Sequence, residues 1–183
     1  MEEGYYTSGQ KDSLWTIYSQ WERNAVRGKG RYRQDQKVGV WEYYAGKGEL
    51  EQRYDHTRNQ LLLDKPGEAA SKLTFTPTGT GAAFETAPVY IGGASAILTF
   101  IGENVKYPPS ALRNQLSGTV RIGFTIASDG TVSNYRVAHP VAASLDEESL
   151  RVIKLLPATW VPAQAAGQPV ATECEVPVSF SIR

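Results

Sequence analysis

The segment 118–137 constrains the fold more than any other part of the chain, because it has the pattern of a β-hairpin. Its first half alternates apolar with polar or small side chains, and the apolar ones are Val120, Ile122, Phe124 and Ile126. A period of two predicts a strand with one face toward a core. Ser128-Asp129-Gly130 supplies turn residues, and the changed parity of the strand after them, 131–137, predicts a bulge. A lone hairpin is marginal in water, so flanking segments must cover it.

Three helices are predicted around the hairpin, over 95–104, 110–116 and 144–156. Ser95 is the expected N-cap of the first helix. Ser144 and Glu147 have the spacing of a capping box at the start of the third. The first and third helices carry apolar residues at helical spacing, so each has one side suited to packing on the hairpin.

The last segment, 172–183, alternates again and predicts a further strand. Its apolar positions are Cys174, Val176, Val178, Phe180 and Ile182. Because Cys174 shares the parity of the apolar residues, we expect a buried thiol rather than a reactive one. It is the only cysteine in the chain, which excludes an intrachain disulfide and a zinc site built from several cysteines.

The first third of the chain contains an internal repeat. Residues 4–18 align with residues 30–44 at a constant offset of 26, and the matches include glycine, tyrosine, glutamine-lysine and tryptophan positions. Each unit is short, aromatic and interrupted by turn residues, which predicts a hairpin. Stacked hairpins bury faces that a single unit leaves exposed.

The repeat resembles MORN-like repeats over residues 4–60. Their glycine, tryptophan and paired tyrosine positions correspond to Gly39, Trp41, Tyr43 and Tyr44. Such aromatic residues usually fill the repeat core. The alternative is that the aromatic residues form a platform that binds a glycan or peptide. Some of Tyr5, Trp21, Tyr43 and Tyr54 would then have to be exposed together on one face.

A connector rich in Gly, Ala, Thr and Pro lies between the two patterned regions. This composition is typical of a loop or linker. We expect three parts: a MORN-like domain over 1–64, a linker over 65–87 and a second domain over 88–183. Residues 72–76 are expected to form a short strand that caps the repeat sheet.

The second domain resembles the C-terminal domain of TonB energy transducers. The family's tyrosine-proline pair corresponds to Tyr107-Pro108, and its strand start to Gly118 and Val120. Its turn corresponds to Asp129-Gly130, and its aromatic-x-Pro motif to Trp160 and Pro162. Ala163 departs from the family's usual glycine. The resemblance implies an α+β fold, with two helices on one face of a three-stranded antiparallel sheet whose last strand lies on an edge, where a partner peptide adds a strand.

The residues themselves allow such an edge. If the even positions of the last strand bond to the hairpin, the backbone groups of Pro177, Ser179 and Ser181 face outward. Proline has no N–H and is tolerated mainly on edge strands. We therefore expect these three residues to contact a partner. The resemblance adds the adjoining motif, Tyr107 and Pro108, to this site. The alternative is that Pro177 protects the edge against pairing.

Composition and motifs argue against several function classes. The 19 Lys and Arg residues balance 19 Asp and Glu residues, so no basic surface predicts a nucleic-acid partner. No stretch is long and apolar enough for a membrane helix, and no signal peptide is recognisable. Phosphate-binding loops, nucleophile motifs and metal-ligand spacings are missing, so we expect no enzyme, no catalytic residues, no cofactor and no metal.

The resemblance to TonB energy transducers implies a periplasmic binding module of TonB type in the cell envelope, which engages a TonB-box-like segment of an outer-membrane transporter by strand addition. Export and membrane anchoring would then depend on a segment outside this chain. The alternative is a stand-alone envelope adaptor whose repeat domain binds a protein or cell-wall glycan, with the TonB-like part forming a homodimer.

Overall fold

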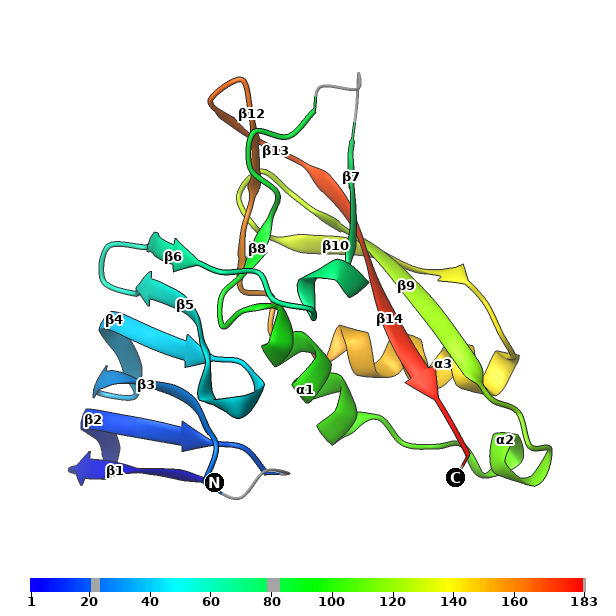
Figure 1. Ribbon diagram of the computed structural model, residues 1–183, viewed down its shortest axis with the longest axis horizontal. Coiled ribbons are helices and arrows are strands. Elements are labelled where there is room, and N and C mark those ends of the chain that lie inside the picture. Colours follow the sequence, from blue (N-terminus) through cyan, green and yellow to red (C-terminus); the bar gives the residue numbers. More distant parts are fainter. Residues whose placement is uncertain (21–23, 79–82, 183) are drawn as a thin grey trace. The chain divides into compact units, whose positions relative to one another are not determined.

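The computed structural model describes residues 1–20, 24–78 and 83–182 (Figure 1). It divides into two compact units. Unit 1 contains Met1–Ala70 and Ile91–Ala96, and unit 2 contains Ser71–Tyr90 and Ile97–Arg183. Each unit has its own sheet.

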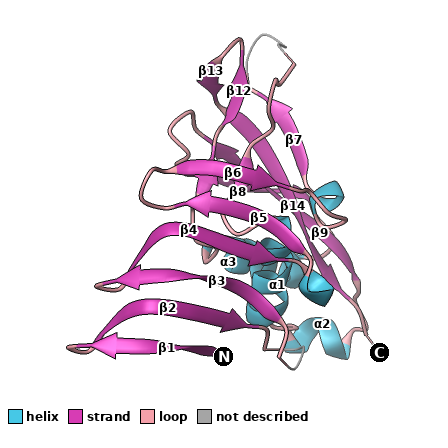
Figure 2. Cartoon of the chain, turned by 60° about the vertical axis from the view of Figure 1, so that its left-hand side comes forward, coloured by secondary structure: helices cyan, strands magenta, loops and turns pink. Residues whose placement is uncertain are grey.

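Unit 1 is a six-stranded antiparallel sheet in which the strands follow one another in sequence order (Figure 2). Its strands are β1 (Glu2–Thr7), β2 (Gln10–Tyr18), β3 (Val26–Arg33), β4 (Gln36–Tyr44), β5 (Leu50–Asp55) and β6 (Gln60–Asp64). A 3₁₀ turn at Gly46–Gly48 joins β4 to β5. Strands β1–β2 and β3–β4 are antiparallel hairpins, as predicted for residues 4–18 and 30–44.

The same contact between a glycine and a tryptophan is found in both units of the 26-residue repeat. A Cβ on Gly4 would lie 2.3 Å from the Trp15 ring, and one on Gly30 would lie 2.4 Å from the Trp41 ring. Each indole N–H also donates to a carbonyl ten residues earlier, at Tyr5 and Arg31 respectively. The Tyr32 ring packs edge-to-face against both indoles, and the Tyr6 ring packs edge-to-face against that of Trp15. Both indoles thus lie flat on a neighbouring strand, because that strand has no side chain there.

The aromatic residues of unit 1 mainly form its core. Tyr43 and Tyr54 are 6% and 5% exposed, whereas Tyr5 is 75% exposed. Trp21 lies outside the described residues. Tyr43 and Tyr54 therefore do not form an exposed row with Tyr5. For these residues, the alternative prediction of a binding platform is wrong.

The main sheet of unit 2 is antiparallel, in the order β10-β9-β14-β7. Its strands are β7 (Thr74–Pro77), β9 (Gly118–Ile126), β10 (Val132–His139) and β14 (Thr172–Phe180). Two small ladders accompany it, β8 (Val89–Tyr90) with β11 (Trp160–Val161) and β12 (Ala163–Ala165) with β13 (Gln168–Val170). The helices are α1 (Ala94–Asn104, whose first three residues belong to unit 1), α2 (Pro109–Arg113) and α3 (Ala143–Lys154).

The predicted hairpin is β9 and β10, and its register shifts between Ser133 and Arg136, so the predicted bulge is confirmed. Helix α3 packs on both strands of the hairpin. The alternating apolar residues of β9 and β14 are buried, with Leu145, Val152 and Ile153 of α3 also in the core. Cys174 is among them, as expected, and its burial raises the pKa of the thiol.

The sheet of unit 2 differs from the predicted one in its number of strands. The expected three-stranded sheet has a fourth strand, because Thr74–Pro77 pairs with Thr172–Glu175 of β14. Residues 72–76 were expected to cap the repeat sheet instead, and that prediction is wrong. A short alternating segment pairs with whichever sheet offers free backbone groups, and β14 offers them on the side away from β9.

Two helix starts also differ from expectation. Helix α1 begins at Ala94, so Ser95 lies inside it, and the Ser95 amide donates to Glu51 of unit 1. Helix α3 has Ala142 as its N-cap without a side-chain cap, so the capping box at Ser144 is wrong. Asp146 instead accepts a hydrogen bond from the Val141 amide at 2.9 Å. Among the described residues, no helix is long and apolar enough to cross a membrane.

Candidate functional site at the edge of β14

The outer side of β14 is covered over only half its length. Its inner side pairs with β9 without interruption from Thr172 to Phe180, whereas its outer side pairs with β7 only from Thr172 to Glu175. No strand of the described residues pairs with that side beyond Glu175. The expectation that the last strand lies on an edge therefore holds for Val176–Phe180 and is wrong for the first four residues.

The direction of the backbone groups follows from two observations. Pro177 lies opposite Arg121 of β9 and has no N–H to donate. At the other end, the Thr78 amide donates to the Ala171 carbonyl at 3.3 Å, on the side of β7. Both observations place the backbone groups of odd-numbered residues away from β9. The free half of the edge thus presents the carbonyl of Pro177 and both backbone groups of Ser179.

The side chains along this edge are small. Ser179 is exposed, and its hydroxyl lies 2.9 Å from the hydroxyl of Thr119 on β9. Ser181 is also exposed but follows the end of β14, so it is not part of the ladder. Pro177 is half-buried. No bulky or charged side chain of these three residues obstructs the approach of another strand.

Tyr107 lies at the end of β14, whereas Pro108 belongs to the start of α2. The Tyr107 ring packs edge-to-face on Phe180, with 5.4 Å between centroids, and its hydroxyl donates to the Leu116 carbonyl at 2.5 Å. Pro108 is the extended N-cap residue before Pro109. Tyr107 therefore supports the strand end next to Ser179 and Ser181, and Pro108 shapes the loop that carries it.

An open groove lies at the same end of the sheet. It has a volume of about 710 Å³ and is lined by Gln115, Ser117, Gly118, Thr119, Ser179, Phe180, Ser181 and Ile182. The lining combines uncharged hydrogen-bonding groups with apolar surface. Such a groove suits one or two side chains of an extended peptide.

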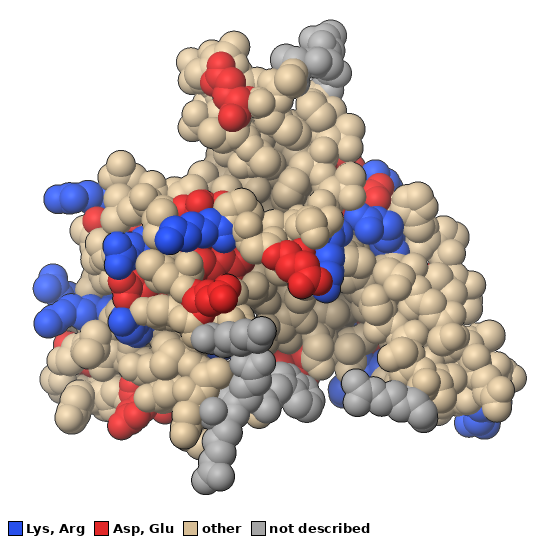
Figure 3. All heavy atoms as spheres, in the orientation of Figure 1, with Lys and Arg blue, Asp and Glu red and all other residues tan. Residues whose placement is uncertain are grey.

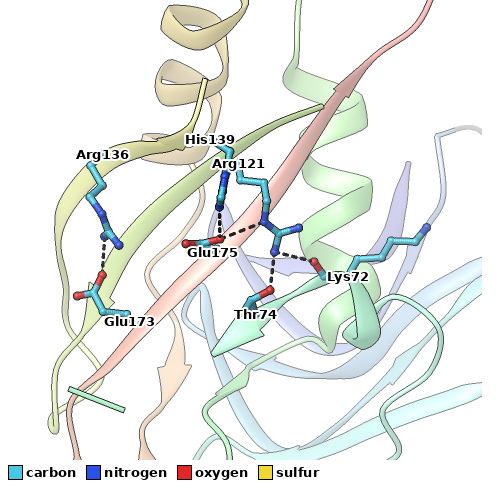
Figure 4. Close-up of polar contacts among 7 residues, drawn as sticks. All are labelled: Lys72, Thr74, Arg121, Arg136, His139, Glu173 and Glu175. Atoms are coloured by element: carbon cyan, nitrogen blue, oxygen red, sulfur yellow. Dashed lines mark hydrogen bonds and ion pairs between the residues drawn. The ribbon is translucent and has the colours of Figure 1, made fainter. Parts of the chain in front are cut away.

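The polar face of the sheet carries a charged cluster that sequence reasoning missed (Figure 4). Arg121 donates through Nε to Glu175 at 3.1 Å and through Nη2 to the Thr74 hydroxyl at 2.6 Å. The same Nη2 lies 3.4 Å from the Lys72 carbonyl. Nε2 of His139 lies 3.5 Å from the same Glu175 oxygen. Arg121 thus joins β9, β14 and the start of β7.

A second pair stands beside it on the same face. Arg136 of β10 bonds Glu173 of β14 (Figure 4). Thr125 donates to the same carboxylate at 2.6 Å. Burial opposes ionisation of Glu173, but these hydrogen bonds prevail and lower its pKa. The opposite charges on 121 and 175 were visible in the sequence, but their pairing follows only from the strand register.

Basic and acidic side chains lie interspersed on the face shown in Figure 3, rather than in patches of one sign. No group of three or more His, Cys, Asp or Glu residues in the described ranges is arranged to hold a metal ion.

Comparison with known proteins identifies a relative of unit 2. The profile of the family described as Gram-negative bacterial TonB protein C-terminal matches residues 103–182. Two solution structures of the Helicobacter pylori TonB C-terminal domain are 26% identical. The first covers 48% of this chain and 78% of its own, with a TM-score of 0.36, and the second covers 47% and 89%, with a TM-score of 0.35. The comparison with curated proteins gives no significant match.

The resemblance predicted from the sequence is thus supported for residues 103–182. Domains of this family interact with outer-membrane transporters and are not enzymes. Residues 103–182 are therefore similar to the C-terminal region of TonB, a protein-interaction module of the bacterial envelope.

Proposed function

We propose that unit 2 is a periplasmic, non-enzymatic binding module of TonB type, which takes up an extended segment of an outer-membrane transporter as an additional strand on β14. The observation that carries the proposal is the free edge beyond Glu175. It offers main-chain acceptors and a donor at Pro177 and Ser179, beside a groove of about 710 Å³. Strand addition uses such groups for affinity and the neighbouring side-chain pockets for specificity.

The free energy available from main-chain hydrogen bonds predicts a modest affinity of the β14 edge for a peptide. Each main-chain hydrogen bond adds about 0.5–1.5 kcal/mol net, and the free edge has room for about three. Ordering a flexible peptide offsets much of that gain. The groove next to Ser179 and Phe180 is therefore the expected source of the remaining affinity, through burial of one or two partner side chains.

The role in energy coupling depends on parts outside unit 2. A domain that only binds the transporter transmits no force unless it is attached to the membrane, so energy coupling would require an anchoring element in addition to unit 2. Unit 1 would be a MORN-like repeat domain, in which Gly39, Trp41, Tyr43 and Tyr44 occupy the repeat positions. In this proposal unit 1 is a spacer or scaffold, and unit 2 holds the transporter.

The test is the substitution Ser179→Pro. It removes the one outward N–H of the free edge without breaking a bond to β9, so the fold should survive. Binding of synthetic peptides from the periplasmic N-terminal segments of outer-membrane transporters, measured by fluorescence anisotropy, should weaken at least tenfold. Ser179→Ala is the matched control, since it keeps the N–H and loses only the hydroxyl contact to Thr119. Equal binding by the wild type and Ser179→Pro would rule out this edge.

A further inference from the structure

We propose that β7 is a displaceable strand, which competes with the transporter segment for the edge of β14. This inference rests on the proposed function and concerns the regulation of the same site. In the resting protein, β7 covers the outer side of Thr172–Glu175. A partner that displaces β7 gains the whole outer side of β14, Thr172–Phe180, instead of the part beyond Glu175.

Strand β7 already makes the kinds of contact that an added strand would make. It pairs antiparallel with β14, and Thr78 donates to the Ala171 carbonyl through its amide and its hydroxyl. Phe75 lies opposite Cys174 on the core face, and its ring packs edge-to-face on Trp160 at 6.3 Å. The occupied half of the edge is therefore built for strand addition, because it already holds a strand with one apolar and one polar face.

The contacts that retain β7 are few. The strand has four residues and is the terminal strand of its sheet. Thr74 and Thr76 are exposed, while Phe75 and Pro77 are only half-buried. Segments with few buried apolar contacts and solvent-exposed backbone bonds open at low free energy, well before the whole domain unfolds. Strand β7 meets that description, whereas β9 and β14 form the buried centre of the sheet.

Arg121 links the position of β7 to the polar face of the sheet (Figure 4). Its guanidinium bonds both Glu175 of β14 and Thr74 of β7. When β7 leaves, the bond to Thr74 is lost but the ion pair with Glu175 remains. Opening therefore leaves no unpaired buried charge, which would otherwise make displacement costly. A partner with a hydroxyl at the position of Thr74 would restore the lost bond.

The chain allows a reversible test, because its only cysteine lies directly opposite Phe75. The pair is of the non-hydrogen-bonded kind, in which Cα atoms are about 4.5 Å apart, within the range that a disulfide spans. The variant Phe75→Cys should therefore lock β7 onto β14 when oxidised with diamide and release it when reduced. Phe75→Ser, treated identically, is the matched control without a second thiol.

Two readouts are measured on the full chain. The first is binding of the transporter peptides described above, which should be at least tenfold weaker to oxidised than to reduced Phe75→Cys, with no such difference for Phe75→Ser. The second is amide exchange at Glu173 and Glu175, whose N–H groups face β7. In the wild type these amides should exchange at least 100-fold faster than those of Cys174 and Val176, which face β9, and the disulfide should remove most of that difference.

The outcomes separate the two proposals. Peptide binding that is equal in the oxidised and reduced forms overturns the competition, while leaving strand addition beyond Glu175 intact. If the peptides bind neither form nor the wild type, the proposed function fails. Exchange alone then decides the displacement of β7, and amides at Glu173 and Glu175 that exchange as slowly as their neighbours overturn it.

Discussion

At the residue scale, Gly30 and Trp41 form a contact that leaves no room for a methyl group. A Cβ on Gly30 would lie 2.4 Å from the fully buried indole, and the ring has little space to move because Tyr32 and Tyr43 pack against it. Gly30→Ala should therefore destabilise unit 1 by about 2–4 kcal/mol through overpacking. Urea unfolding of the full chain, followed by amide exchange in β3 and β4, measures the effect.

The repeat supplies a matched pair of controls for this prediction. Gly4→Ala meets Trp15 in the same way, although on a terminal strand that can shift more easily, so a smaller loss is expected. Gly46→Ala meets no atom within 4 Å and should change stability by no more than about 0.5 kcal/mol. A Gly30→Ala variant as stable as Gly46→Ala would contradict the packing of the indole on β3.

The pKa of Lys37 is lowered to about 8, mainly by burial and secondarily by the charge of Lys11. Its Nζ lies 4.4 Å from the centroid of the Trp41 ring and 3.1 Å from the Tyr43 hydroxyl. Between pH 8 and 10.5 the unfolded chain holds a proton that the folded chain has released, so this group makes stability rise with pH in that window. Below pH 8 its contribution is constant.

The free energy of unfolding of the wild type should consequently rise by about 1–2 kcal/mol relative to that of Lys37→Met between pH 7.5 and 9.5. Urea unfolding at both pH values tests this. Lys11 is the equivalent residue one repeat earlier. Burial opposes its charged form, but the bond to Glu2 raises its pKa. Lys11→Met should therefore keep most of the rise, reduced only because the Lys11 charge also lowers the pKa of Lys37. A rise that persists in Lys37→Met would exclude Lys37 as its cause.

Residue roles were predictable where they depend on strand parity. The burial of Cys174 and the outward backbone of Pro177 and Ser179 both follow from alternation along one strand. The capping box at Ser144 was not realised, because the N-cap of α3 lies two residues earlier, at Ala142, and Asp146 bonds the preceding loop. Sequence spacing shows that a capping box could form, but the residue at which the loop turns into the helix decides whether it does.

At the element scale, periodicity predicted the strands but not all of their partners. The hairpin β9–β10, strand β14 and the repeat hairpins all follow from alternation and turn residues. Strand β7 was expected in the wrong sheet, because four residues of alternating Thr, Phe and Pro fit any free edge. What decides its position is the outward backbone of β14 together with the bond from Arg121 to Thr74. Both depend on residues about 50 to 100 positions away.

The segment from Tyr107 to Leu116 gives a prediction at this scale. The Tyr107 hydroxyl donates a hydrogen bond to the Leu116 carbonyl at the far end of the segment. The Tyr107 ring packs on Phe180 at the end of β14. Tyr107→Phe should cost about 1 kcal/mol of stability by losing one hydrogen bond, with peptide binding nearly unchanged. Tyr107→Ala should also weaken peptide binding several-fold, because the strand end loses its support.

Chemical denaturation and peptide titration of both variants separate these effects. The Phe variant is the control for the ring, since it keeps the packing on Phe180. Equal loss of peptide binding in both variants would mean that the hydroxyl itself contacts the partner, rather than positioning the strand end.

At the scale of the whole molecule, the chain combines two architectures whose separate patterns were legible in the sequence. Aromatic residues at a spacing of 26 mark unit 1, and the order of TonB-like motifs marks unit 2. The connector between these patterns was less predictable, since part of it joins the sheet of unit 2 as β7. Its composition is that of a loop, and composition does not indicate that a segment completes a distant sheet.

The balance of charge leads to a last prediction about association with the partner. The chain carries 19 basic and 19 acidic residues, and two cations on the polar face of the sheet are paired, Arg121 with Glu175 and Arg136 with Glu173. Without a field of one sign, long-range steering is weak. The association rate with a transporter peptide, measured by stopped-flow fluorescence, should therefore change by less than about threefold between 50 and 500 mM salt.

Peptides extended by two lysines or by two aspartates provide the control, because a neutral surface should accept both at similar rates. A steep fall with salt for one of them only would reveal a charged approach path that the balanced composition conceals. Removing one partner of a pair should create such a path. In Arg136→Gln the released Glu173 carboxylate would favour the lysine-extended peptide at low salt, and this preference should disappear at 500 mM, where exposed charges are screened within about 5 Å.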